Sequence, residues 1–356
     1  MKAFLILEEG TVFTGTSIGS TKSVISEIVF NTSMTGYLEV LTDPSYAGQA
    51  VVMTYPLIGN YGITPDMESA QPWPDGYIVR ELSRIPSNFR CQGTVQDFLK
   101  EHDIPGIAGI DTRALTKILR EKGTMNGMIT TDENYKLDEI LPQLHVYNTG
   151  NVVDKVTCSE KEVLKADGYK VALLDFGAKN NIAQSLHKRG CEVTIYPAHT
   201  TAEEILASNP DGIMLSNGPG DPKACTDIIK EVKKLYDSEV PIFAICLGHQ
   251  LMALATGADT YKLKYGHRGG NHPVKDLETG RVYISSQNHG YAVDAESLDP
   301  AVAVPAFTNV NDGTNEGLKY TGKNIFTVQF HPEACPGPQD SGYLFDKFIE
   351  MMGGQK

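Results

Sequence analysis

Basic residues are scarce in this chain, and they are nowhere gathered into a cluster. Its 356 residues include 31 Lys and Arg against 44 Asp and Glu, which gives a formal net charge of −13. A protein that binds a nucleic-acid backbone needs a basic stripe to neutralise the phosphates. The composition therefore argues against nucleic acid as a partner.

The chain also lacks a segment that would carry it into or across a membrane. Its first apolar run ends at Glu8 after only five residues, too few for the core of a signal peptide. The uncharged stretch 240–258 approaches the length of a bilayer span, but Pro241, Gly248 and Gly257 divide it into a strand, a turn and a helix. We therefore expect a cytoplasmic protein with no membrane partner.

Cys-x-x-Cys pairs and nucleotide-binding glycine motifs are missing as well. The six cysteines are scattered, which argues against a zinc site and a disulfide framework, and in the cytoplasm they are expected to stay reduced. No P-loop occurs, and no Gly-x-Gly-x-x-Gly follows a predicted strand. We expect no cofactor on this chain.

Two histidines close in sequence raise the question of a metal. His267 and His272 have no carboxylate or thiol at ligand spacing beside them. Zinc sites are usually recognised by Cys, His or carboxylate ligands at such short spacings. The sequence therefore predicts two surface histidines and no metal site.

The length predicts two domains of about 150 residues each. The pattern of expected strands and helices changes near the middle of the chain. Residues 1–150 carry two helices, near Val95–His102 and Thr112–Lys122, and the second has Asp111 before it as N-cap and Gly123 after it. Short β-type runs lie at Phe4–Leu7, Val24–Phe30 and Ala50–Tyr55. This domain is expected to be mostly β, of α+β type.

The second half alternates strands with helices. A polar, charged linker at 151–168 precedes an α/β domain at 169–356. Its first strands are apolar throughout, which is typical of a parallel sheet covered by helices on both faces. Hairpins follow residue 260. We expect a mixed, largely parallel, doubly wound sheet.

The sharpest chemical feature is Cys246, in the run PIFAICLGHQLM at 241–252. An apolar strand, a nucleophile and a glycine before a helix form the pattern of a nucleophile elbow, in which a tight turn lifts the side chain out of the sheet. The helix N-terminus stabilises a thiolate. Taken alone, a cysteine in an apolar run is more often a buried structural residue.

His331 and Glu333 favour the catalytic interpretation of Cys246. A predicted strand delivers His331 at its carboxyl end, and Glu333 is close enough in sequence to orient the imidazole. The three residues make a triad in which a base activates the nucleophile and a carboxylate orients the base. By itself, His-Pro-Glu more often marks an ordinary turn.

A glycine-rich loop, SNGPGDP at 216–222, follows another apolar strand. The backbone N–H of Gly218, together with that of Leu247, could form an oxyanion hole for charge that develops on an attacked carbonyl. A plain turn is the alternative interpretation.

These motifs together resemble those of the class I (triad) glutamine amidotransferases over residues 170–350. The N-terminal half resembles the domain found in small subunits of carbamoyl-phosphate synthase, through residues 36–46, 54–62 and 109–116. The resemblance therefore covers almost the whole chain.

The resemblance implies that Cys246 forms a γ-glutamyl thioester with glutamine. His331 would protonate the departing ammonia and then activate water, Glu333 would orient His331, and the N–H groups of Leu247 and Gly218 would hold the oxyanion. The contacts with glutamine that it implies are at Ser45, Gly220, Gln250, Asn288, Gly290 and Tyr291. Read without the family, Ser45 and the stretch 288–290 predict turns.

The chain departs from the family pattern at two positions. Leu38 stands where Gln is usual, and Tyr291 where Phe is common. A contact made by the backbone at Tyr291 should survive that change. We assign no role to Lys179, in a motif shared with the family, or to Cys335, two residues beyond Glu333.

The missing nucleotide motif and the resemblance together imply a heteromer. Ammonia would pass through a channel to a large subunit that binds ATP and makes carbamoyl phosphate, for arginine or pyrimidine biosynthesis. Two alternatives stay open: a stand-alone γ-glutamyl hydrolase of the same fold, and an inactive regulatory module that binds glutamine.

Overall fold

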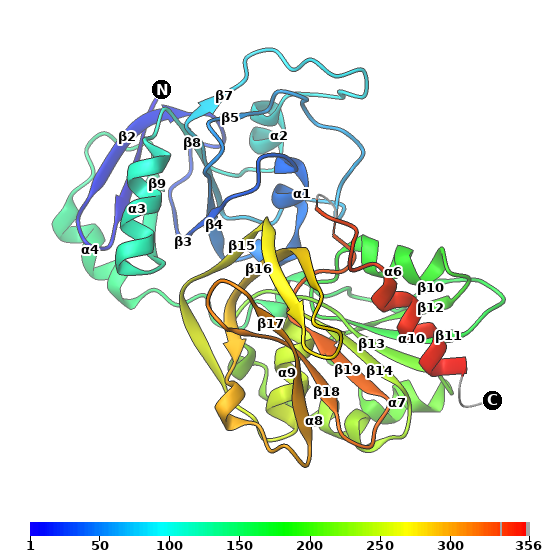
Figure 1. Cartoon of the computed structure of the whole chain (residues 1–356). Helices are drawn as coiled ribbons and strands as arrows, with labels where there is room; N and C mark the ends of the chain where they lie inside the picture. Colours follow the sequence, from blue (N-terminus) through cyan, green and yellow to red (C-terminus); the bar gives the residue numbers. More distant parts are fainter. Residues whose placement is uncertain (335–336, 354–356) are drawn as a thin grey trace. The chain divides into compact units, whose positions relative to one another are not determined.

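The computed structural model describes residues 1–334 and 337–353 of the chain. It divides into two compact units, Met1–Thr149 and Gly150–Lys356, shown in Figure 1. Each unit has hydrophobic clusters of its own. Among the described residues, no helix is both long and apolar enough to span a bilayer.

Seven strands of the N-terminal unit close into a barrel. In barrel order they are β1 (Lys2–Leu7), β2 (Val12–Ser17), β8 (Gly106–Ala108), β6 (Gly76–Ile78), β4 (Gln49–Met53), β3 (Val24–Asn31) and β9 (Met125–Thr130). Two short strands, β5 (Leu57–Ile58) and β7 (Glu81–Leu82), pair separately. The expectation of a mostly β domain is confirmed, but the unit has helices beyond the two expected near Val95–His102 and Thr112–Lys122.

The helices described in this unit are α1 (Tyr37–Thr42), α2 (Val95–Glu101), α3 (Thr112–Lys122) and α4 (Leu137–Val146). Side-chain N-caps begin α2 and α3, whereas α1 and α4 have no such cap. The Asp111 side chain accepts from the Ala114 amide at the start of α3, and Gly123 follows its end with a φ of 104°. Leu115 and Leu119 are buried in the barrel's cluster. The predicted bounds of α3 are confirmed.

The C-terminal unit is built on a ten-stranded sheet. Its order is β10 (Glu162–Leu164), β12 (Glu192–Pro197), β11 (Lys170–Asp175), β13 (Gly212–Leu215), β14 (Ile242–Ile245), β19 (Ile325–Val328), β18 (Asn315–Tyr320), β17 (Ala303–Asn309), β15 (Thr260–Asp276) and β16 (Val282–Val293). The strands from β12 to β19 in this order are parallel, and the remaining pairs are antiparallel. The predicted mixed sheet is confirmed, with its parallel part running from β12 to β19.

Helices cover both faces of the parallel part of this sheet. Helices α7 (Ala202–Ala207), α8 (Thr226–Asp237) and α9 (Leu247–Ala255) pack into one apolar cluster, and α6 (Asn180–His187) and α10 (Tyr343–Gly353) pack into another. Because strands β13 and β14 are buried on both faces, their side chains are apolar throughout.

The stretch 151–168, expected to be a linker, is folded. It contains α5 (Val153–Val156) and β10, which pairs antiparallel with β12. The side chain of Val153 is fully buried in the sheet's cluster. The polar composition of this segment predicted a linker because a strand at the edge of a sheet needs few apolar side chains.

Residues 288–290, which read locally as a hairpin turn, lie within β16. This strand pairs antiparallel with β15, and the ladder places Arg268 opposite Asn288. The turn expectation is wrong because pairing between distant segments outweighs the local preferences of Asn and Gly.

The N-cap of α3 gives a stability prediction. Asp111→Ala removes the acceptor for the Ala114 amide, so we expect a loss of about 1 kcal/mol in the free energy of unfolding of the N-terminal unit. Asp111→Asn keeps an acceptor and should stay within a few tenths of wild type. Urea unfolding followed by circular dichroism measures both, and equal stability of Asp111→Ala and wild type would contradict the assignment.

Candidate active site

Cys246 occupies the tight turn between β14 and α9. Its φ of 52° and ψ of −105° lie in a region that residues other than glycine rarely adopt. The side chain is buried, and the Cys246 amide donates to the Val328 carbonyl of the neighbouring strand β19 at 2.8 Å. The turn therefore has the strained strand-to-helix geometry of a nucleophile elbow.

Two groups lie against the Cys246 thiol. Gln329 Nε2 donates to Sγ at 3.5 Å, and Sγ lies 3.7 Å from the Asn288 carbonyl oxygen. The Gln329 side chain also accepts from Gln250 Nε2 at 3.0 Å. An N–H donor stabilises negative charge on sulfur, so Gln329 belongs to the candidate site. No role for Gln329 was predicted from the sequence. The feature that could have indicated one is its position directly after β19, the strand that pairs with β14 and so lies beside Cys246.

His331 and Glu333 form a buried pair. His331 Nδ1 lies 2.6 Å from Glu333 Oε1, and both side chains are fully shielded from solvent. The other nitrogen, His331 Nε2, is buried and has no hydrogen-bond partner in the described part of the chain. It is therefore available for proton transfer, while Glu333 fixes the orientation of the ring.

Lys179, to which no role was assigned from the sequence, lies beside Glu333. Its Nζ is 3.6 Å from Glu333 Oε1, and both side chains are nearly inaccessible. Burial alone would raise the pKa of Glu333, but the charges of His331 and Lys179 lower it below its ordinary value. Lys179 thus helps to keep the Glu333 carboxylate ionised. The ionised carboxylate is the partner that stabilises a positively charged His331.

The glycine-rich loop after β13 packs tightly against the start of α9. A Cβ on Gly218 would lie 2.2 Å from the Phe176 carbonyl oxygen and 2.7 Å from Leu247 Cδ2. Gly220 has a φ of +92°, which favours glycine. The loop is therefore a close-packed element beside Leu247, and its position supports the predicted contribution of the Gly218 amide to an oxyanion hole.

Gln250 and strand β16 are tied together. Gln250 Nε2 donates to the Tyr291 carbonyl at 2.8 Å, and the same carbonyl accepts from His289 Nδ1 at 2.7 Å. The hydrogen bonds at Tyr291 thus involve its backbone, and a Phe-to-Tyr difference leaves them unchanged. Asn288 and Gly290 flank His289 in the same strand.

Ser45 belongs to the N-terminal unit. It lies in a short 3₁₀ helix, Pro44–Tyr46, where its amide donates to Asp43 Oδ1 at 2.9 Å. Its contact with glutamine remains a prediction. Leu38, the departure from the family pattern, is fully buried in α1 and serves the core of that unit. Cys335 lies outside the described residues.

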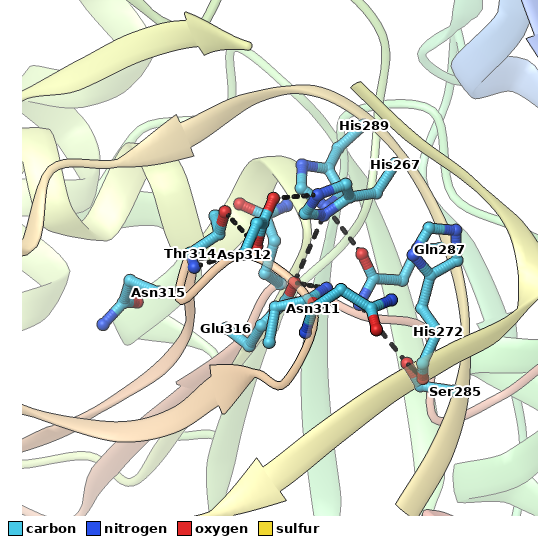
Figure 2. Close-up of polar contacts among 12 residues, drawn as sticks. His267, His272, Ser285, Gln287, His289, Asn311, Asp312, Thr314, Asn315 and Glu316 are labelled. Carbon is cyan, nitrogen blue, oxygen red and sulfur yellow. Dashed lines mark hydrogen bonds and ion pairs between the residues drawn. The ribbon is translucent and has the colours of Figure 1, made fainter. Parts of the chain in front are cut away.

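The expectation that His267 is a surface residue is wrong. The side chain is buried, with Nε2 2.8 Å from Asp312 Oδ2 and Nδ1 3.4 Å from Glu316 Oε1 (Figure 2). Burial alone would lower the pKa of His267, but the two carboxylates raise it to about 9. The His267 imidazole is therefore cationic at neutral pH when no metal is bound. His272 is half-buried. Local spacing did not predict this cluster because its carboxylates follow more than forty residues later.

Comparison with known proteins identifies the class of protein to which this site belongs. The family model described as "Glutamine amidotransferase class-I" matches residues 172–351, and "Carbamoyl-phosphate synthase small chain, CPSase domain" matches residues 5–129. The C-terminal unit is therefore a class I glutamine amidotransferase domain.

Curated relatives extend the match to the whole chain. The carbamoyl phosphate synthase small chain of Clostridium perfringens is 52% identical and covers 98% of this chain and 99% of its own length. Those of Listeria monocytogenes and Fusobacterium nucleatum are each 51% identical, covering 100% and 97% of this chain and 98% and 97% of their own lengths. The chain belongs to the carbamoyl phosphate synthase small chain family.

The packing behind the elbow gives a prediction for Gly248→Ala. The new Cβ would lie 2.6 Å from the Leu215 carbonyl oxygen and 2.7 Å from Leu215 Cβ, which pushes α9 away from β13 and displaces Cys246. Since small displacements of a nucleophile cost about 10²-fold, we expect kcat/KM for glutamine hydrolysis to fall by that order. Gly93→Ala, where an added Cβ meets nothing within 4 Å, is the matched control, and an unchanged Gly248→Ala enzyme would contradict the packing argument.

The Lys179 ion pair gives a pH prediction. The pKa of Glu333 is lowered in the folded chain, so its stabilising contribution is complete above the unfolded pKa of about 4.3. That contribution is lost as the pH falls through the folded value. Lys179→Met removes one of the charges that lower this pKa, so the acid limb of kcat/KM and of stability should move to higher pH. Lys179→Arg should keep the wild-type limb; identical pH profiles for all three would show that the ion pair has no such effect.

Proposed function

We propose that Cys246, His331 and Glu333 hydrolyse glutamine and that the ammonia passes to a large ATP-dependent subunit for carbamoyl phosphate synthesis. The observation that carries the assignment of residues is the buried His331–Glu333 pair, delivered by the strand next to the Cys246 elbow. Membership of the carbamoyl phosphate synthase small chain family supports the same reaction.

The first half of the reaction forms a thioester. The Cys246 thiolate attacks the side-chain carbonyl carbon of glutamine, and the N–H groups of Leu247 and Gly218 receive the oxyanion. As the tetrahedral intermediate collapses, the C–N bond breaks and the His331 imidazolium gives its proton to the leaving nitrogen. Glu333 stabilises that imidazolium while it carries the charge.

The second half reverses the roles. Neutral His331 takes a proton from water, the resulting hydroxide attacks the thioester, and the C–S bond breaks to release glutamate and restore the thiolate. We assign glutamine contacts to Ser45, Gly220, Gln250, Asn288, Gly290 and Tyr291. Gln329 supports the same pocket, since its amide bridges Gln250 and the Cys246 sulfur.

The partner proposal follows from the family and from the chemistry. The relatives are named small chains, which supports a heteromer with a large chain, and carbamoyl phosphate synthesis needs a phosphate donor. A stand-alone γ-glutamyl hydrolase gives no reason for an N-terminal domain that matches the small-chain family over 5–129. An inactive module gives no reason for a strained Cys beside a buried His–Glu pair.

Cys246→Ser tests the proposal in the assembled enzyme. Glutamate release should fall by at least about 10³-fold, whereas carbamoyl phosphate synthesis from added ammonium should persist because the partner's chemistry is untouched. Cys158→Ser is the control, since burial and Asp175 raise the pKa of that thiol to about 12 and leave it a poor nucleophile. Equal glutamate release by Cys246→Ser and wild type would sink the assignment.

A chain purified without a partner gives the complementary measurement. If the ammonia is destined for a large subunit, the isolated chain should release glutamate but form no carbamoyl phosphate with ATP and bicarbonate. Carbamoyl phosphate made by the chain alone would refute the division of labour.

A further inference from the structure

A second buried cluster of ligand-type side chains contains no member of the triad. His267 comes from β15, His289 from β16 and Glu316 from β18, and their relative exposures are 7%, 5% and 0% (Figure 2). One donor atom of each lies within 4.8 Å of the other two. Three strands thus bring two imidazoles and a carboxylate to one point.

Each of the three side chains is held in place from behind. His267 Nε2 donates to Asp312 Oδ2 at 2.8 Å, and His289 Nδ1 donates to the Tyr291 carbonyl at 2.7 Å. Glu316 Oε1 accepts from Asn309 Nδ2 at 3.0 Å. Metal-bound histidines and carboxylates are typically fixed by outer partners of these kinds, which orient the ligand and raise its basicity.

The opposite atoms of the same side chains have weaker contacts. Glu316 Oε2 is buried with no hydrogen-bond partner in the described part of the chain, and His267 Nδ1 makes no hydrogen bond there but lies 3.4 Å from its ion-pair partner Glu316 Oε1. Because His289 Nδ1 donates to the Tyr291 carbonyl, the ring in its neutral form offers Nε2 as an acceptor, and that nitrogen lies 3.0 Å from the Gln287 side chain. The three side chains thus bring ligand atoms within 4.8 Å of one another inside the protein, close enough for one metal ion to join them.

We propose that His267, His289 and Glu316 bind a zinc ion, with the fourth position open. Ligand atoms about 2.0–2.1 Å from a tetrahedral zinc are about 3.3 Å apart. His267 Nδ1 and Glu316 Oε1 are 3.4 Å apart, and the ligand atoms of the three side chains all lie within 4.8 Å of one another. Two imidazoles and one carboxylate suit zinc, whereas magnesium and calcium prefer oxygen ligands throughout.

The ion has a structural role in this proposal. It joins β15, β16 and β18 at the point where His289 separates Asn288 from Gly290, two of the residues assigned to glutamine binding. Bound zinc therefore fixes the strand segment that faces the Cys246 sulfur, without taking part in the chemistry there. The zinc proposal rests on the cluster alone and stands or falls independently of the proposed function.

Metal binding by the full-length chain tests the proposal directly. The chain is stripped of metal and titrated with zinc against a chromophoric chelator, and we expect it to take up a single ion and to unfold at a higher temperature when loaded. Cobalt(II) in place of zinc should give the visible spectrum of a four-coordinate nitrogen and oxygen site, with no thiolate charge-transfer band.

Variants identify the ligands. Glu316→Gln removes a ligand and Asp312→Asn weakens the support behind His267, so zinc affinity should fall by about 10–100-fold in each. His272→Asn is the matched control, because the His272 ring lies 5.1 Å from that of His267 but is outside the ligand set; its affinity should equal that of wild type. Circular dichroism of the metal-free variants establishes that they are folded.

Several results would overturn the zinc site. Failure of wild type to compete with a micromolar chelator would mean that the His267 imidazolium alone satisfies the two carboxylates. A thiolate band with cobalt would place the metal on cysteine, and a loss of affinity in His272→Asn but not in Glu316→Gln would give a different ligand set. The wild-type measurements decide the question even if a variant fails to fold.

Discussion

The site depends on one strained turn, in which Cys246 is held at a positive φ between β14 and α9. A residue keeps such a conformation only where its surroundings over-determine it. Here the Cys246 amide is bonded to β19, and Gly248 leaves no space between α9 and the Leu215 carbonyl. Gly218 closes the third side by packing on Leu247. The two glycines therefore allow the close packing that fixes the direction of the Cys246 sulfur.

The parallel sheet explains why residues far apart in the chain meet at this turn. The carboxyl ends of adjacent parallel strands lie along one edge, where α/β folds place their sites. Cys246 follows β14, Gln329 and His331 follow β19, and the glycine-rich loop follows β13. Lys179, soon after β11, adds its charge to Glu333 at the same edge. Each strand thus supplies part of the site, and the order of the strands decides which residues become neighbours.

Sequence alone predicts what is encoded locally or in a compact motif. The caps of α3, the apolar strands and the elbow around Cys246 all carry their information within a few residues, and the two-domain, largely parallel architecture follows from them. The rest depends on contacts between distant segments. Asn288 to Gly290 resemble a turn until β15 pairs with them, and Gln329 is an unremarkable polar residue until Cys246 lies beside it. His267 gains its carboxylates only when β17 pairs with β15 and brings β18 and the residues before it alongside.

The closed barrel of the N-terminal unit has a consequence for molecular recognition. In its seven-membered ring every strand has a neighbour on each side, although β2 pairs with β8 only at Thr16 and Ser17, so a strand of another protein finds little free edge here. Recognition of another chain by this barrel should therefore run mainly through side chains and connecting loops. Binding energy in such an interface is concentrated in a few side chains. Point substitutions could therefore change which protein binds while the barrel itself stays the same.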